Sequence, residues 1–123
     1  MKNLLSAIII SLIFLSQTGC KKIIDDAISC TTESFFLYIE GDVDASNLKL
    51  VHFTFVNSDT SGDYILDNHI KWDFGDGVTE TSQGLTINHT YATTGSYTAK
   101  ANYTLHKGSS SCSGYKEKTI NVN

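Results

Sequence analysis

The residues from Tyr97 to Leu105 alternate between apolar and polar side chains without a break. A period of two is typical of a β-strand that has one face in a protein core and the other face in water. The apolar positions are Tyr97, Ala99, Ala101, Tyr103 and Leu105. The segment therefore predicts an antiparallel strand, because strands of parallel sheets are buried on both faces.

Shorter stretches of the same alternation lie on either side of this segment. Their apolar positions are Phe35, Leu37 and Ile39; Val51, Phe53 and Phe55; Ile70, Trp72 and Phe74; Leu85, Ile87, His89 and Tyr91; and Ile120 and Val122. The turns expected between them are Gly41-Asp42, residues 57–63, Gly75-Asp76-Gly77 and residues 107–111. Six or seven short strands with such turns predict an all-β, two-sheet antiparallel sandwich.

The N-terminal 20 residues have a different character. One Lys is followed by an apolar run from Leu4 to Leu15 and then by small or polar residues before Cys20. A run of about 12 residues is short for a membrane span and matches the hydrophobic region of a secretory signal. We expect residues 1–19 to be a cleaved signal peptide, residues 20–32 to be a solvated tether and residues 33–123 to be the folded domain.

Thr18-Gly19-Cys20 resembles the end of a bacterial lipobox, although Gln17 replaces the usual aliphatic residue. The resemblance implies lipidation of Cys20, and several acyl chains together anchor a protein stably. The alternative is an ordinary secretory signal in which Cys20 is incidental. The residues after it (Lys21, Lys22, Asp25 and Asp26) loosely resemble signals that send bacterial lipoproteins to the outer face. We expect a lipid-anchored protein of the bacterial envelope, at the outer membrane, exposed either on the surface or to the periplasm.

The most specific part of the sequence consists of three short motifs. They are Trp72-Asp73-Phe74-Gly75-Asp76-Gly77, His89-Thr90-Tyr91 and Gly95-Ser96-Tyr97-Thr98-Ala99. In this order they resemble the signature of the PKD domain family. The members of this family are immunoglobulin-like β-sandwich modules. The family has Val where this chain has Ala99. The resemblance covers residues 33–123 and implies an immunoglobulin-like fold.

The residues of these motifs also have structural roles that do not depend on the family. Trp72 and Phe74 alternate inward and can fill the space between two sheets. Asp76 can accept backbone N–H bonds in a tight turn between two glycines. Tyr91 is placed like a tyrosine corner, and His89 shares its inward face, which favours a structural histidine over a ligand.

Charge and motif content exclude several classes of function. After removal of residues 1–19, eight Lys face thirteen Asp plus Glu, a net charge of −5, and the chain has no Arg. This argues against a nucleic acid partner. The histidines lack zinc-site spacing, and no nucleophile motif is present, so we expect neither a metal nor another cofactor nor catalysis. Asp67, Asp73 and Asp76 could suggest a calcium site, but Asp42, Asp44 and Asn47 do not match the further ligands that calcium-binding modules resembling this one take from the first strand, so a turn role is favoured.

Two cysteines remain once Cys20 is set apart. Cys30 precedes the first expected strand, and Cys112 lies near the last hairpin. In an oxidising compartment two cysteines can pair completely, so we expect one disulfide bond between them. Two free thiols are the alternative.

The sequence favours a binding or spacing module without enzymatic activity. The membrane, through the lipid anchor, and an extracellular protein or glycan are the expected partners. A structural accessory subunit of a larger envelope complex is the alternative, and the fold alone does not choose between them.

Overall fold

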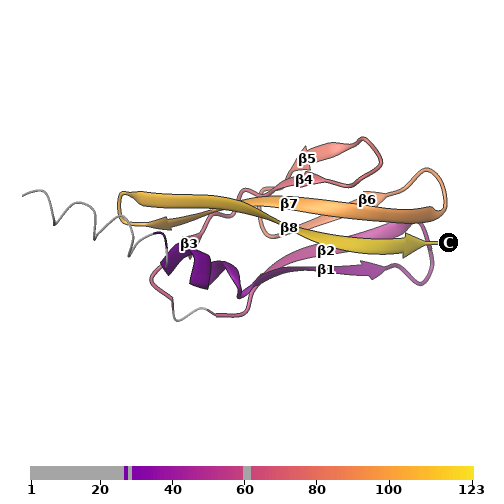
Figure 1. The fold of residues 1–123 in the computed structure, drawn as a ribbon. Helices are drawn as coiled ribbons and strands as arrows, with labels where there is room; N and C mark the ends of the chain where they lie inside the picture. The colour runs from indigo at the N-terminus through magenta and orange to yellow at the C-terminus, as the bar shows by residue number, and fades with distance from the viewer. Residues whose placement is uncertain (1–26, 28, 60–61) are drawn as a thin grey trace, which may run out of the picture.

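The computed structural model describes residues 27, 29–59 and 62–123. The expected signal peptide, Cys20 and the first part of the expected tether lie outside the described residues. Within them the chain is an all-β, immunoglobulin-like sandwich with a short helix at residues 29–34 (Figure 1). The strands are β1 (Leu37–Val43), β2 (Leu50–Asn57), β3 (Ile65–Leu66), β4 (Lys71–Asp73), β5 (Thr79–Thr81), β6 (Thr86–Thr90), β7 (Gly95–Lys107) and β8 (Ser110–Val122).

The strands form two antiparallel sheets. The first has the order β1-β2-β6. The second is built around β7, which pairs with β8 along all of its 13 residues on one side and with β4 and β3 on the other, while β5 extends it beyond β4. Figure 1 shows the two sheets as layers that run in nearly the same direction.

The elongated sandwich has two different ends. At one end, which we call the helix pole, the helix at residues 29–34 lies beside the β7–β8 turn at Gly108 (Figure 1). At the other end, the loop pole, lie the β1–β2 loop (residues 44–49), the β6–β7 loop (residues 91–94) and the C-terminus. Strand register brings these together, because Leu50 pairs with Thr90 and Gly95 pairs with Val122.

The hydrophobic core lies between the sheets and follows the predicted alternation. The buried apolar residues are Leu37, Ile39, Val51, Phe53, Phe55, Tyr64, Ile70, Trp72, Phe74, Tyr91, Ala99, Ala101, Tyr103, Leu105, Ile120 and Val122. Leu85, Ile87 and Tyr97 are only partly buried and pack at its margin. Most of the expected inward positions are therefore confirmed.

The interpretation of Phe35 as an inward strand residue is wrong. Its side chain is 77 % exposed. Its backbone N–H donates to the carbonyl of Thr32 at 3.1 Å, in the turn that ends the helix, and β1 begins only at Leu37. Strand alternation therefore does not extend back to it.

Gly41-Asp42 is not a turn either, because both residues lie inside β1. A Cβ on Gly41 would come within 2.6 Å of the Ile120 side chain and 3.3 Å of the Phe53 ring. Glycine at this position lets β1 pass close to the core side chain of β8. Gly41 is thus required by close packing and not by a reversal of the chain.

The last hairpin is longer than expected. Its turn is confined to Gly108 and Ser109, and the serines at 110 and 111 already belong to β8. Gly108 has φ +59°, a conformation that glycine adopts without the steric cost of a side chain. Two strands of 13 residues at about 3.4 Å per residue give a hairpin about 40 Å long.

Candidate functional site

Trp72 is the centre of the core. It is completely buried, and its ring lies 5.6 Å from that of Phe53 and 6.4 Å from that of Phe74 between centroids. Its Nε1–H donates to the Ser82 hydroxyl at 3.2 Å, and Ser82 in turn donates to the Gly84 carbonyl. The polar end of the indole is thus satisfied inside the core.

The turn after β4 depends on its two glycines. Gly75 and Gly77 have φ values of +78° and +92°, where L side chains are strained. At Gly75 a Cβ would also meet the Thr98 carbonyl oxygen at 2.6 Å. Asp73 accepts the N–H of Gly75, and Asp76 accepts the N–H of Val78, each at 3.0 Å. Both carboxylates are therefore engaged in shaping the turn.

His89 joins this turn to β6. Its Nε2 lies 2.7 Å from Asp76 Oδ2, its ring stacks on Phe74 with centroids 3.9 Å apart, and its side chain is 11 % exposed. Desolvation by burial acts to raise the pKa of Asp76, but bonds from His89 and the Val78 N–H hold it below its ordinary value. The imidazole and the carboxylate thus form an internal pair that links the two sheets.

Tyr91 closes the same region from the β6–β7 loop. Its hydroxyl donates to the Phe74 carbonyl at 3.0 Å, which is the kind of bond made by a tyrosine corner. Burial, with smaller effects of Asp76 and Tyr97, raises the pKa of Tyr91 to about 12. The ring stacks on Tyr97 at 4.2 Å, and the Tyr97 hydroxyl donates to the Thr93 carbonyl at 3.0 Å.

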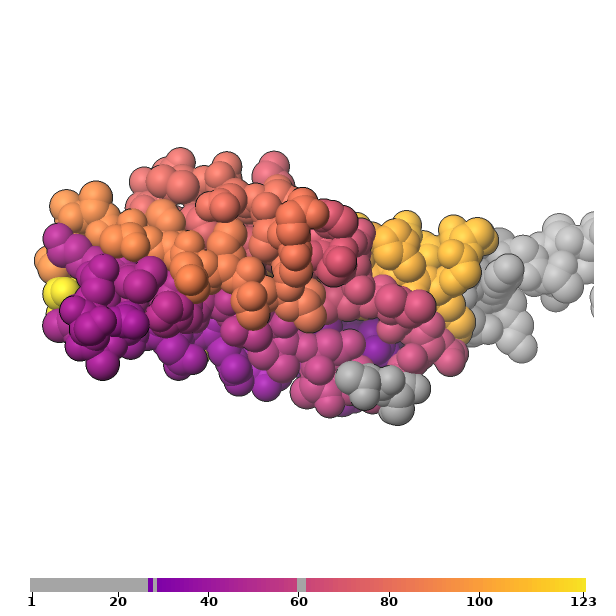
Figure 2. Space-filling view, turned by 180° about the vertical axis from the view of Figure 1, so that it is seen from behind, coloured from indigo at the N-terminus to yellow at the C-terminus, as the bar shows by residue number. Residues whose placement is uncertain are grey.

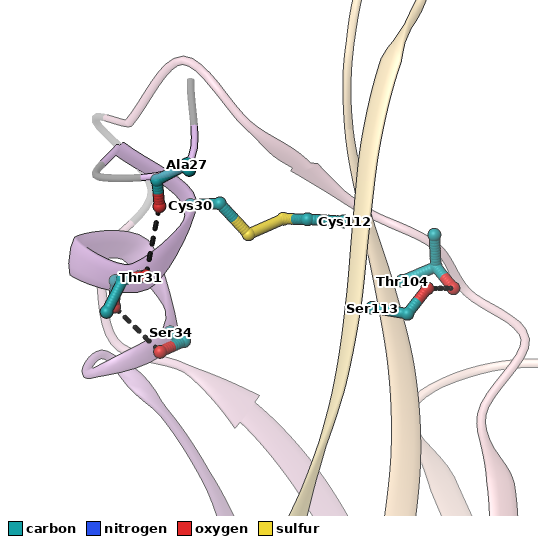
Figure 3. The surroundings of a disulfide bond; sticks show 7 residues. All are labelled: Ala27, Cys30, Thr31, Ser34, Thr104, Cys112 and Ser113. Carbon is teal, nitrogen blue, oxygen red and sulfur yellow. Dashed lines mark hydrogen bonds between the residues drawn. A yellow bond between two sulfur atoms is a disulfide. The ribbon is translucent and has the colours of Figure 1, made fainter. Parts of the chain in front are cut away.

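A disulfide bond joins Cys30 to Cys112 at the helix pole (Figure 3). The two Cα atoms are 6.4 Å apart, and 82 positions separate the residues in sequence. Cys30 lies on the helix at residues 29–34 and Cys112 on β8 near the hairpin tip. The last residues of the expected tether are thus helical and are covalently held to the sandwich.

The helix pole also contains a cavity of about 240 Å³. It is lined by Ser29, Thr32, Glu33, Asp63, Tyr64 and Lys107. Glu33 is only 7 % exposed, and its Oε1 has no hydrogen-bond partner. Lys107 Nζ lies 2.8 Å from Asp63 Oδ2 at the cavity. This is the one place in the described part of the chain where a buried side-chain polar atom is left without a partner.

A model of the PKD domain matches residues 37–122. The chain belongs to the PKD domain family. Its motif residues therefore occupy the centre of a PKD domain, where Trp72, Phe74, His89 and Tyr91 pack against one another. A PKD domain is a β-sandwich module, and such modules are generally non-catalytic.

Among solved structures, the PKD1 domain of the Vibrio cholerae metalloprotease PrtV is similar to this chain. The sequence identity is 24 %, the match covers 71 % of this chain and 96 % of that chain, and the TM-score is 0.46. No curated protein matches the chain.

The carboxylates and histidines of this PKD domain pair locally. Asp44 accepts the N–H groups of Ser46 and Asn47, and its other oxygen lies 3.3 Å from His52 Nε2. Asp67 lies between His69 and His106, at 3.2 and 3.6 Å. Over the described residues, no group of three or more His, Cys, Asp or Glu side chains is arranged to hold a metal ion. Asp67, Asp73 and Asp76 each accept a local backbone N–H.

Glu33 is the polar residue that reading the sequence missed. It is one of four glutamates, and it directly precedes residues that resemble a strand, so nothing in its neighbourhood signals burial. Its environment depends on Gly62, 29 positions away, where a Cβ would overlap both carboxylate oxygens. A usable signal would have been a glycine required by close approach instead of by a turn, and such a glycine cannot be distinguished within one sequence.

Proposed function

We propose that this chain is a lipoprotein of the bacterial cell envelope whose PKD domain binds a protein or glycan, or holds such a partner away from the membrane. The family supports a non-catalytic module. The N-terminal apolar run and Cys20 support export and lipid anchoring. No helix in the described residues is long and apolar enough to cross a membrane.

One observation carries the proposal. The described chain enters at the helix pole, while the C-terminus and the loops at residues 44–49 and 91–94 lie at the opposite end (Figure 1). Seven positions separate Cys20 from Ala27 and can span at most about 25 Å. An anchor at Cys20 would therefore keep the helix pole within about 25 Å of the membrane and leave the loop pole free to face away from it.

The disulfide bond makes the attachment of the helix to the sandwich stiffer. It fixes the helix to the hairpin, so the chain entering from the anchor meets a rigid body about 40 Å long at its first turn of helix. A spacer requires length and stiffness, and a binding module of this form presents its loop pole to a partner.

The proposal is tested by fractionation and site-specific crosslinking in intact cells. Cys20→Ala should release the protein from membranes, whereas Thr18→Ala, which keeps the cysteine, should leave it bound. A photoreactive residue at Thr94, in the loop pole, should capture a partner that the same residue at Glu80, on the exposed strand β5, does not. Firm membrane association of the Cys20→Ala variant would overturn the lipoprotein assignment. Capture at both Thr94 and Glu80 within a complex of fixed stoichiometry would indicate an accessory subunit instead.

A further inference from the structure

Within the described part of the chain, Glu33 carries the one buried side-chain polar atom that lacks a hydrogen-bond partner. Gly62 packs directly against it, and Glu33 is 7 % exposed. Oε1 nevertheless makes no hydrogen bond, although it lines a cavity with room for more than one water-sized molecule. A buried acceptor without a partner costs free energy, and a buried charge without a partner costs more.

Among the described residues that line the cavity, carboxylates outnumber cations. Of the described residues that line it, Lys107 is the cation, and its ammonium lies 2.8 Å from Asp63. This pair is neutral as a unit, and Glu33 Oε1 has no hydrogen-bond partner among the described residues. Desolvation first, and then the negative charges of Asp59 and Asp63, raise the pKa of Glu33 above its ordinary value.

The donor set selects the kind of cation that fits. A hard metal ion such as Ca²⁺ takes six or more oxygen ligands. Among the described residues, no group of three or more His, Cys, Asp or Glu side chains is arranged to hold a metal ion. An ammonium group needs less, because its three N–H donors can be met by one carboxylate and nearby hydroxyls. Glu33 supplies the carboxylate, and Ser29 and Thr32, which carry hydroxyl groups, also line the cavity.

Tyr64 adds a surface suited to the same ligand. The ring is 7 % exposed and lines the cavity, and Lys107 Nζ already lies 5.6 Å from its centroid. Aromatic rings attract cations through their negative faces. The cavity is smaller than a typical drug-sized pocket, so it suits the end of one alkyl chain.

We propose that this cavity binds a primary ammonium group, carried by a lysine side chain of a partner protein or by a free alkylamine, with Glu33 as its carboxylate. The two sources share one chemistry, in which an N–H donor reaches Oε1 and an alkyl chain lies toward Tyr64. The proposal does not depend on lipid anchoring, and it places a recognition site at the helix pole.

The test is an NMR titration of the full-length chain in detergent at pH 7. The probes are n-butylammonium, Nα-acetyl-lysine methylamide, n-butanol and calcium chloride, added separately. Both amines should shift the Glu33 carboxyl carbon and the amides of residues 29–34 in a saturable manner, whereas n-butanol should not. Tighter binding of the lysine derivative assigns the ligand to a protein side chain, and tighter binding of butylammonium assigns it to a free amine.

Two matched variants separate recognition from general charge effects. Glu33→Gln keeps the shape and removes the charge, and it should weaken amine binding at least about tenfold. Glu40→Gln makes the same change at an exposed position of β1 and should leave binding unchanged. Equal binding of butanol, unchanged binding by Glu33→Gln, or a response of Glu33 to calcium but not to amines would each overturn the proposal. Folding of both variants is checked by the amide spectrum of β7 and β8.

Discussion

The centre of the sandwich and the helix pole solve the problem of buried polar groups in different ways. At the centre, the indole of Trp72, the Asp76–His89 pair and the Tyr91 hydroxyl all have hydrogen-bond partners inside the fold. At the helix pole, a covalent bond holds the elements together and the carboxylate of Glu33 lacks a partner at Oε1. A fully satisfied interior suits a framework, whereas an unsatisfied acceptor beside a cavity suits a site.

Figure 2 shows a second aspect of this difference. Most of the sandwich forms a continuous packed body, while the β7–β8 hairpin projects beyond the other strands at the helix pole. The hairpin tip is held there by β3 on one side and by the disulfide to the helix on the other. The hairpin tip therefore has fewer neighbouring elements than the centre. We expect substitutions at the two places to change the free energy of unfolding by different amounts.

The largest effect is expected from removing the central aromatic side chain. Trp72→Ala should lower the free energy of unfolding by about 3–5 kcal/mol, because it leaves a cavity among Phe53, Phe55 and Phe74. Urea denaturation measures it. Tyr115→Ala, an exposed aromatic of β8, is the control and should cost far less. A Trp72 variant as stable as the wild type would mean that the centre does not carry the framework.

Removal of the disulfide bond should cause the second largest loss of stability. Replacing Cys30 and Cys112 by Ala together should cost about 2–4 kcal/mol, since the bond closes a loop spanning 82 positions in the unfolded chain. Hydrogen exchange should quicken at residues 29–34 and much less around Trp72. Intact mass after alkylation without reductant gives the direct check, because two labelled thiols in the purified protein would contradict the bond.

Loss of a single hydrogen bond at the centre should lower the free energy of unfolding by less than the loss of Trp72 or of the disulfide bond. Tyr91→Phe removes the donor to the buried Phe74 carbonyl and should cost about 1–2 kcal/mol in thermal or urea unfolding. Tyr38→Phe makes the same change at a half-exposed position and serves as its match, with an expected cost near zero. Equal effects of the two substitutions would show that the bond from Tyr91 adds nothing.

The centre of the sandwich could be predicted from the sequence, whereas most of the helix pole could not. Alternation and the motif residues follow local periodicity, so the inward positions of β2, β4, β7 and β8 could be predicted. The exposure of Phe35 could not, because it depends on where a short helix ends. Gly41 and Gly62 are required by contacts with Ile120 and Glu33, which lie far away in sequence. Close approach between distant segments leaves no periodic signal.

The smallest expected effect on stability separates the two regions most sharply, because it depends on pH. The raised pKa of Glu33 means that the fold prefers the protonated acid. Its contribution to stability is fully present below the unfolded-state pKa of about 4.3 and is lost as the pH rises through the raised folded-state value. Without added amines, Glu33→Gln should therefore match the wild type near pH 4 and exceed it at pH 7, by less than about 1.5 kcal/mol.

The pH dependence due to Glu33 must be measured as the difference in stability between variants. The pKa values of Asp63, Asp67 and Asp76 are lowered, so these groups make the whole fold more stable as the pH rises and would mask the opposite trend of one glutamate. Urea midpoints of wild type, Glu33→Gln and the exposed control Glu40→Gln, taken from pH 4 to pH 8, isolate it. Parallel curves for wild type and Glu33→Gln would mean that the carboxylate is satisfied in solution, and the contrast between the two regions would then disappear.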